Sequence, residues 1–358
     1  MKTLLRLLLK SQHQRNRSGP AQTEKGMTLV ELLVGAIMAF LIITPMLAFV
    51  VDMLNTDRRE QVKSNTEQDV QAALDFLAQD LSQAIYIYDN NSTLTSTPTS
   101  TATGIPALLA GNFIPAENPT QTPILVFWKR ELMKNSMPLE ANVEPNNCQP
   151  MGPKDCNDTY VLALVAYYQV TEPNAIWCQP SGGSCPTRIV RYQFKDGLRN
   201  PYSIDPNPFN RYFTGVSDSQ KRSKAFDPRF DISNPTQNVT MKQDFGDPEV
   251  LVNYIDHSPG PTLTGQECMT ALGNPTDTTG VTPIQLPEET LKIPKSTSLN
   301  QPNSFYACVD TARNIARVTI RGNSLRRIQT DAVNYDAKKA AYFPTASVQV
   351  QGLGARGK

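Results

Sequence analysis

One segment constrains this chain more than any other: Leu32–Val51, "LLVGAIMAFLIITPMLAFVV", is a run of twenty residues without a charge. At about 1.5 Å per residue, a helix of this length spans roughly 30 Å, the thickness of the hydrocarbon core of a bilayer. Residues 1–26 hold six lysines and arginines against a single acidic residue, Glu24. Basic residues keep their flank cytoplasmic. The sequence therefore predicts one inner-membrane span, with a cytoplasmic N-terminus and a periplasmic C-terminal domain.

Two simple interpretations of this segment leave something unexplained. A cleaved secretory signal has an apolar region of about 7–15 residues that ends in a small-x-small site, whereas this run is longer and no such site follows Val51. A plain membrane anchor fits the length but leaves Glu31 unexplained, since a carboxylate at the centre of a membrane helix costs about 2.5–3.5 kcal/mol. Near the end of the run the cost is smaller, yet the carboxylate still needs a partner.

The stretch "KGMTLVELLV", residues 25–34, resembles the processing site of type IV pilins and pseudopilins. In that family a prepilin peptidase removes a basic leader after a glycine, on the cytoplasmic side, and methylates the new N-terminus. The fifth residue of the mature chain is a glutamate. The resemblance places cleavage between Gly26 and Met27, makes Met27 the methylated residue and makes Glu31 the fifth residue. It rests on the leader, the glycine, the glutamate and the apolar helix occurring together.

The resemblance also implies partners and a role for the carboxylate. Mature helices of the family bundle in a filament core, where the glutamate is thought to pair with the N-terminal ammonium of a neighbour. Because a buried pair is tolerable and a lone buried charge is not, we expect Glu31 to set the axial register of assembly. Pro45 lacks an amide donor and should kink the helix. The expected partners are prepilin peptidase, other pseudopilins or pilins, the inner-membrane assembly platform and membrane lipid.

Helical spacing continues beyond the apolar run. Residues 27–51 are expected to form the membrane half of one long helix, and residues 52–89 its amphipathic half, with an apolar stripe at Val70, Leu74, Leu77, Leu81 and Ile85. The simplest interpretation is that the stripe faces the core; a partner-binding stripe is the alternative. Residues 90–123 begin with "NNSTLTSTPTSTATG" and are expected to form a Ser/Thr/Pro-rich surface loop, with a contact site or a sugar attachment point as the alternatives.

The remainder, residues 124–358, is expected to be a β-rich periplasmic domain. Runs rich in β-branched and aromatic residues predict strands, and no helical crossovers separate them, so the sheet should be mainly antiparallel. The predicted strands are 124–130, 160–170, 188–194, 250–255, 304–310, 315–322 and 347–352. Proline-rich stretches at 198–247 and 257–302 are interpreted as long loops. The predicted fold class is α+β, with a long N-terminal helix packed on this domain, as in type IV pilins.

All six cysteines lie downstream of the apolar run, and their number is even. Disulfides form in oxidising compartments, so this pattern indicates export, whereas free thiols in a cytosolic protein are the alternative. "CQPMGPKDC" and "CQPSGGSC" form short loops that a local bridge can close. Six cysteines can pair in many ways, and the sequence does not fix the connectivity. The pairing we expect is Cys148 with Cys156, Cys178 with Cys185 and Cys268 with Cys308.

Several kinds of function receive no support from the sequence. The net charge of +1 gives no reason to expect nucleic-acid binding. There is no phosphate-binding loop, nucleophile elbow or zinc spacing, so we expect no enzyme activity, no catalytic residue, no metal and no cofactor. Asp244, Asp247 and Glu249 could hold calcium, but the spacing favours a solvated turn. Arg326 and Arg327 are expected at a solvated edge, with an anion site as the alternative, and His257 is expected in a loop.

The strand pattern and the segment "EQDVQAALDFLAQDLSQAI" resemble the J-type minor pseudopilins of type II secretion and the W-type minor pilins. The large insertions are similar to those of a cyanobacterial pseudopilin group tied to hormogonium polysaccharide secretion. This resemblance implies a non-enzymatic minor subunit of a periplasmic filament that serves polysaccharide or protein secretion. The bulk of the chain argues against the major subunit and favours a role at the tip or in initiation of the filament, and the sequence does not decide between tip and shaft. The alternatives are a minor pilin for motility or DNA uptake and a membrane-anchored periplasmic binding module.

Overall fold

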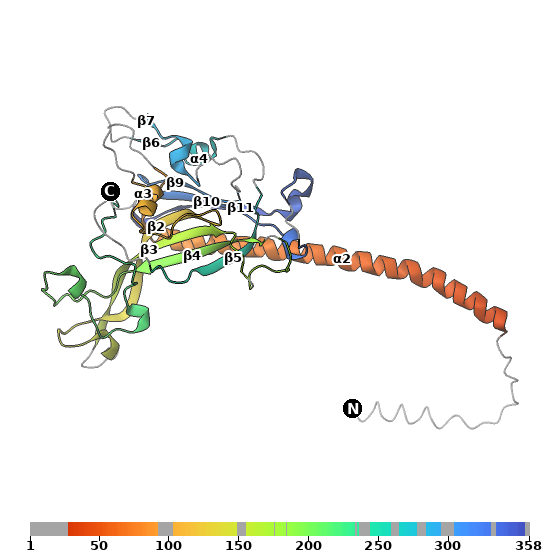
Figure 1. The fold of residues 1–358 in the computed structure, drawn as a ribbon, viewed down its shortest axis with the longest axis horizontal. Coiled ribbons are helices and arrows are strands. Elements are labelled where there is room, and N and C mark those ends of the chain that lie inside the picture. The colour runs from red at the N-terminus through yellow and green to blue at the C-terminus, as the bar shows by residue number, and fades with distance from the viewer. Residues whose placement is uncertain are drawn as a thin grey trace, which may run out of the picture. The chain divides into compact units, whose positions relative to one another are not determined.

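The structure is a computed structural model that describes residues 28–91, 103–148, 155–174, 176–183, 185–232, 235, 244–258, 265–277, 284–294, 304–330 and 334–354. The chain divides into two compact units, Met1–Arg58 and Arg59–Lys358. One helix, α2 (Leu29–Ser82), contributes its first half to the first unit and its second half to the second unit. The fold is α+β with antiparallel sheets, as predicted (Figure 1).

In the first unit, α2 begins directly after Thr28, whose Oγ1 accepts a hydrogen bond from the backbone N–H of Glu31 at 3.3 Å. This bond satisfies one of the amide donors that the first turn of a helix leaves free. The helix then continues through Pro45 without interruption. Its apolar part has a mean hydropathy of 2.5 over an 18-residue window, and its length suffices to cross a membrane. One span therefore remains the prediction for this segment.

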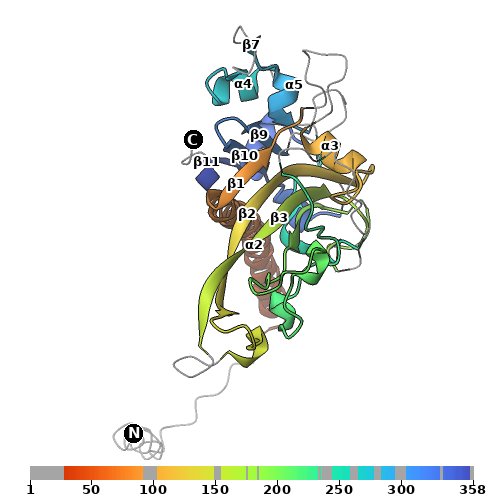
Figure 2. The same ribbon diagram turned by 90° about the vertical axis from the view of Figure 1, so that its left-hand side faces the viewer.

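The second unit contains a five-stranded antiparallel meander in the order β1-β2-β3-β4-β5. Figure 2 shows β1, β2 and β3 side by side. Its strands are β1 (Ala84–Tyr88), β2 (Gln121–Pro138), β3 (Cys156–Val170), β4 (Thr187–Lys195) and β5 (Glu249–Ile255). Adjacent strands follow one another in the chain, so each strand pairs with its neighbour without a crossover. The longest pair, β2 and β3, extends beyond the other strands and carries a small apolar cluster built on Met133, Val161, Leu198 and Phe213.

A second sheet has the order β11-β10-β9-β8. It contains β8 (Lys292–Ile293), β9 (Phe305–Asp310), β10 (Ile315–Arg321) and β11 (Thr345–Gln351). A β-bridge between Ile255 and Gly322 connects the ends of the two sheets. The smaller elements are α3 (Ile105–Ala110), α4 (Glu267–Ala271), α5 (Glu288–Leu291) and the pair β6 (Thr276–Asp277) and β7 (Ile284–Gln285).

The second half of α2 packs into the core of this unit. Its apolar stripe is buried at Val70, Leu74, Leu77 and Leu81, which confirms that the stripe faces the core. Close approach is possible at Gly322, where an added Cβ would lie 2.6 Å from Cγ2 of Thr66. Glycine is therefore required at this contact because any larger residue would displace the helix.

Two predicted boundaries differ from the structure. The amphipathic helix was expected to run to residue 89, but it ends at Ser82, and Ala84–Tyr88 form β1. The sequence "AIYIY" pairs with β2, placing Ile87 opposite Phe127, so sheet pairing overrides the helical spacing of Ile85. The expected loop 90–123 contains α3 and the start of β2, and its residues 92–102 lie outside the described part.

Candidate functional site

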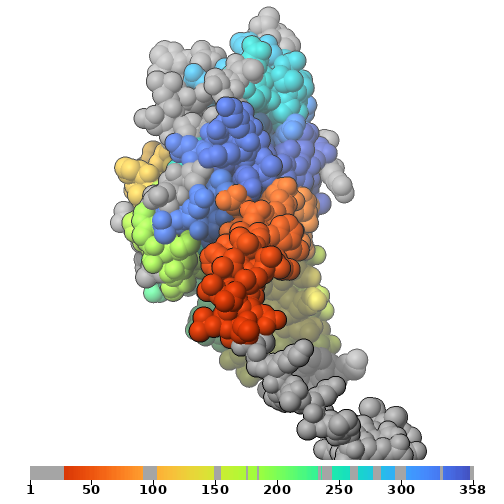
Figure 3. Space-filling model, turned by 90° about the vertical axis from the view of Figure 1, so that its right-hand side faces the viewer, coloured from red at the N-terminus to blue at the C-terminus, as the bar shows by residue number. Residues whose placement is uncertain are grey.

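The first half of α2 presents apolar side chains on every side. All described residues of the first unit are exposed, including the large apolar side chains from Leu29 to Val51. Figure 3 shows this part of α2, in red, from its N-terminal end. The exposed fraction is 70% for Phe40 and for Phe49. A helix that is apolar all round requires an apolar environment on all sides, such as lipid or other helices. This surface is the first candidate functional site.

The structure describes the predicted assembly residues but not the predicted processing site. Gly26 and Met27 lie outside the described residues, so the proposed cleavage site remains a prediction. Glu31 lies in the first turn of α2 and is exposed. Pro45 lies in the interior of the helix, where it cannot donate to the Leu41 carbonyl. The neighbouring Thr44 hydroxyl donates to the Phe40 carbonyl at 2.8 Å. The expected kink at Pro45 stays a prediction.

A buried charged cluster joins α2 to three strands of the second unit. Asp80 of α2 accepts hydrogen bonds from Lys129 Nζ of β2 at 2.7 Å and from the Tyr167 hydroxyl of β3 at 2.7 Å. Arg191 Nε of β4 donates to Oδ2 of the same carboxylate at 2.9 Å, and this oxygen also accepts the hydrogen bond from Tyr167. Asp80 is 6% exposed and Arg191 7%. One carboxylate thus balances two buried cations.

The electrostatics of this cluster follow from burial and charge. Burial raises the pKa of the Asp80 carboxyl, but Arg191, Lys129 and Tyr167 together outweigh burial and hold that pKa below its usual value. Burial and the adjacent Asp80 raise the pKa of the Tyr167 hydroxyl. Asp80 therefore stays ionised and Tyr167 stays protonated at neutral pH. The cluster fixes the helix against the sheet, and we assign it to structure rather than to catalysis.

All three expected disulfides are present: Cys148–Cys156, Cys178–Cys185 and Cys268–Cys308. The first closes the loop that precedes β3, and the third joins α4 to β9 inside a small apolar cluster. Within that cluster, the Glu288 carboxylate accepts hydrogen bonds from the backbone N–H groups of Cys268 and Met269, both at 2.9 Å. The expected export to an oxidising compartment, where disulfides form, stays a prediction.

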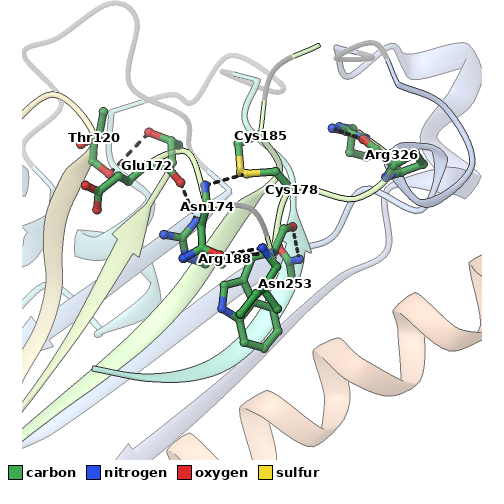
Figure 4. Close-up of a disulfide and its surroundings, with 12 residues drawn as sticks. Thr120, Glu172, Asn174, Cys178, Cys185, Arg188, Asn253 and Arg326 are labelled. Carbon is green, nitrogen blue, oxygen red and sulfur yellow. Dashed lines mark hydrogen bonds between the residues drawn. A yellow bond between two sulfur atoms is a disulfide. The ribbon is translucent and has the colours of Figure 1, made fainter. Parts of the chain in front are cut away.

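Figure 4 shows how the second disulfide shapes the loop between β3 and β4. The backbone N–H of Asn174 donates to Sγ of Cys178 at 3.0 Å, and the Asn253 amide donates to the Trp177 carbonyl at 2.9 Å. Arg188 donates to the Glu172 carbonyl at 2.7 Å. The bridge therefore holds a short loop against β5 through Asn253.

Two of the three acidic residues considered for calcium have basic partners. Asp244 pairs with Lys224 at 3.1 Å, whereas Glu249 Oε2 lies 3.5 Å from Nη1 of Arg191. Among the described residues, no group of three or more histidine, cysteine, aspartate or glutamate side chains could hold a metal ion. Asp244 and Glu249 therefore each have a basic partner, Lys224 and Arg191.

The basic pair near the C-terminus was predicted at a solvated edge, and this is wrong for Arg326. That side chain is 3% exposed and donates to the carbonyls of Gln329 and Pro180. Arg327 pairs with Asp69 of α2 and lies 4.4 Å from the ring centroid of Tyr254. The error arose because Pro180 and Asp69 are distant in sequence from the two arginines, so no local pattern signals these contacts.

Sequence reasoning also missed a cavity in the stretch 198–247, which it interpreted only as loops. The cavity is lined mainly by arginine, lysine and phenylalanine side chains of that stretch. The signal was present as interleaved basic and aromatic residues in "FNRYF" and "KRSKAFDPRF".

Comparison of the chain with protein-family models, with curated proteins and with solved structures found no match in any of the three.

Proposed function

We propose that this chain is a minor pseudopilin, a non-enzymatic subunit of a periplasmic filament of the type II secretion and type IV pilus kind. The observation that carries the proposal is the helix beginning at Leu29, whose first half is apolar on all sides and starts within the stretch "KGMTLVE". Such a helix can lie in lipid before assembly and among other helices after it. The resemblance of residues 25–34 to a pilin processing site supplies the link between the two states.

Glu31 gains a role under this proposal. Cleavage after Gly26 would create an ammonium group on Met27, four residues before the carboxylate. In a bundle of helices that ammonium can neutralise Glu31 of a neighbouring subunit, which removes the cost of an isolated charge in an apolar environment. Cleavage then frees the helix and supplies the cation for docking in one step.

The second unit supports a minor rather than a major subunit. It comprises about 300 residues with long insertions between strands, and such bulk is hard to pack in a repeating shaft. We therefore assign the chain to a tip or to the start of a filament, with one inner-membrane span and a periplasmic body. Polysaccharide or protein secretion is the process we favour, and a motility or DNA-uptake pilus is the alternative that shares the same N-terminal features.

Incubation of the full chain with a prepilin peptidase tests the proposal. The expected result is a mass decrease equal to residues 1–26, followed by a mass increase of one methyl group on Met27. A Gly26→Val variant is the matched control and should stay uncut, because the family cuts after a glycine. An intact mass for the unsubstituted chain would remove the proposal and leave a membrane-anchored binding module.

A further inference from the structure

A cavity of about 480 Å³ lies in the second unit, within the range of small-molecule sites in proteins. It is formed by the stretch between β4 and β5. Its lining combines three cations, two carboxylates, two phenylalanines and one alanine: Arg222, Lys224, Arg229, Asp227, Asp244, Phe209, Phe226 and Ala225. The proposed filament role does not use this cavity.

Two of the three cations already have a carboxylate. Arg229 binds the buried Asp227, which lies two residues earlier in the chain, through Nε at 3.1 Å and Nη2 at 2.8 Å. Lys224 pairs with Asp244 at 3.1 Å, and both side chains are more than half exposed. An exposed ion pair of this kind contributes little stability. The pair between Lys224 and Asp244 can therefore break, and both side chains can bind a ligand instead, at little cost in free energy.

Arg222 is the cation that the described part of the chain leaves without a carboxylate. Its guanidinium carbon lies 5.3 Å from the ring centroid of Phe209 and 4.7 Å from that of Tyr212. Its Nη1 is buried and, among the described residues, has no hydrogen-bond acceptor. Backbone packing holds the residue in place, since Gly197 leaves room that a Cβ would fill 3.0 Å from Cβ of Arg222.

This arrangement places two positively charged guanidinium groups against one aromatic ring. Arg229 lies 5.1 Å from the Phe209 centroid, so Phe209 contacts two guanidinium groups. Asp227 neutralises Arg229 only. The buried Nη1 is out of reach of a ligand, so a carboxylate in the cavity would contact Arg222 through its other guanidinium nitrogens, with the charge-assisted hydrogen bonds that guanidinium groups donate to carboxylates.

We propose that this cavity binds an acidic sugar, with the sugar carboxylate on Arg222. The exposed part of Phe209 offers apolar surface to a sugar ring, and the rim residues Lys224 and Asp244 supply a donor and an acceptor for its hydroxyls. The inference rests on the second unit alone. It therefore stands or falls separately from processing at Gly26.

Calorimetric titration of the full chain in detergent with D-glucuronate tests the inference. Saturable binding of glucuronate is expected, with at least about tenfold weaker binding of D-glucose, which lacks the carboxylate. N-acetylglutamate should also bind more weakly than glucuronate. Equal affinity for glucose would overturn the anion site, and equal affinity for N-acetylglutamate would overturn the sugar assignment.

Variants locate the binding. Arg222→Gln should weaken glucuronate binding at least about tenfold, and Lys224→Gln about twofold to fivefold. Lys224 is 81% exposed, so its variant keeps the fold even where Arg222→Gln does not. Arg211→Gln is the matched control, an exposed arginine of the same stretch outside the cavity lining, and should keep full affinity. Unchanged binding in both Arg222→Gln and Lys224→Gln would overturn the proposal.

Discussion

Nε of Arg191 and Oδ2 of Asp80 lie 2.9 Å apart in the interior of the second unit, and they join strand β4 to helix α2. Lys129 binds the other oxygen of Asp80, so this carboxylate is the buried anion of a cluster with two buried cations. An exposed second carboxylate, Glu249, lies 3.5 Å from Arg191. A buried ion pair contributes little net stability, whereas removing one of its partners is strongly destabilising. Removing Asp80 leaves Lys129 buried without its carboxylate and leaves Arg191 with only the exposed Glu249.

Asp80→Asn should therefore destabilise the second unit by about 3–5 kcal/mol, measured by urea unfolding of the full chain in detergent. Glu249→Gln is the matched control, because Glu249 contacts the same Arg191 but is 79% exposed. It should change the free energy of unfolding by less than about 0.5 kcal/mol. Equal effects of the two substitutions would contradict the assignment of Asp80 as the central charge.

The pH dependence of stability follows from the direction of the Asp80 shift. The pKa in the folded state lies below the unfolded value of 3.8, so the carboxylate stabilises the fold above that pH. This contribution is lost as the pH falls through 3.8 toward the lower folded pKa. The stability difference between the unsubstituted chain and Asp80→Asn should be constant near neutral pH and shrink below about pH 4. A difference that grows on acidification would show the opposite sign.

Asp89 provides an internal contrast in the same experiment. Burial raises the pKa of the Asp89 carboxyl, so its ionisation opposes folding as the pH rises. Both proteins in the comparison retain Asp89, and its contribution cancels in their difference. Measuring the difference, rather than either curve, isolates Asp80.

The disulfides should differ in their effect on stability because they close loops of different length. Cys268–Cys308 spans 40 residues and Cys178–Cys185 spans 7. The chain-entropy relation gives about 4 kcal/mol for the longer loop and about 2.5 kcal/mol for the shorter one. Urea unfolding of the two double Cys→Ala variants measures this order. A larger loss for the short loop would show that loop entropy does not dominate.

Glu31→Gln should leave membrane insertion intact and reduce incorporation into filaments, if the carboxylate pairs with a neighbouring N-terminus. Incorporation is measured by immunoblotting of filaments sheared from cells of the native host. Asp52→Asn, which removes a carboxylate at the opposite end of the apolar run, serves as the control and should incorporate normally. Unchanged incorporation of Glu31→Gln would remove the register hypothesis.

Much of the fold could be predicted because its signals are local. The runs at 160–170 and 188–194 became β3 and β4 with boundaries within a few residues. β1 was missed because Ile85 continues the helical spacing of Leu81, and only pairing with β2 makes that segment a strand. The surroundings of Arg326 were missed because its acceptor at Pro180 is far away in the chain.

By itself, the sequence determined the apolar segment, the short cysteine loops and the strand-forming runs, since composition and spacing within a few residues decide them. It marked Asp80 only as one polar residue on a helix. The tertiary structure decided that this carboxylate faces Lys129, Tyr167 and Arg191, and that Arg222 lies between Phe209 and Tyr212. Those relations depend on packing of distant segments, where burial turns single charges into strong determinants of stability and binding.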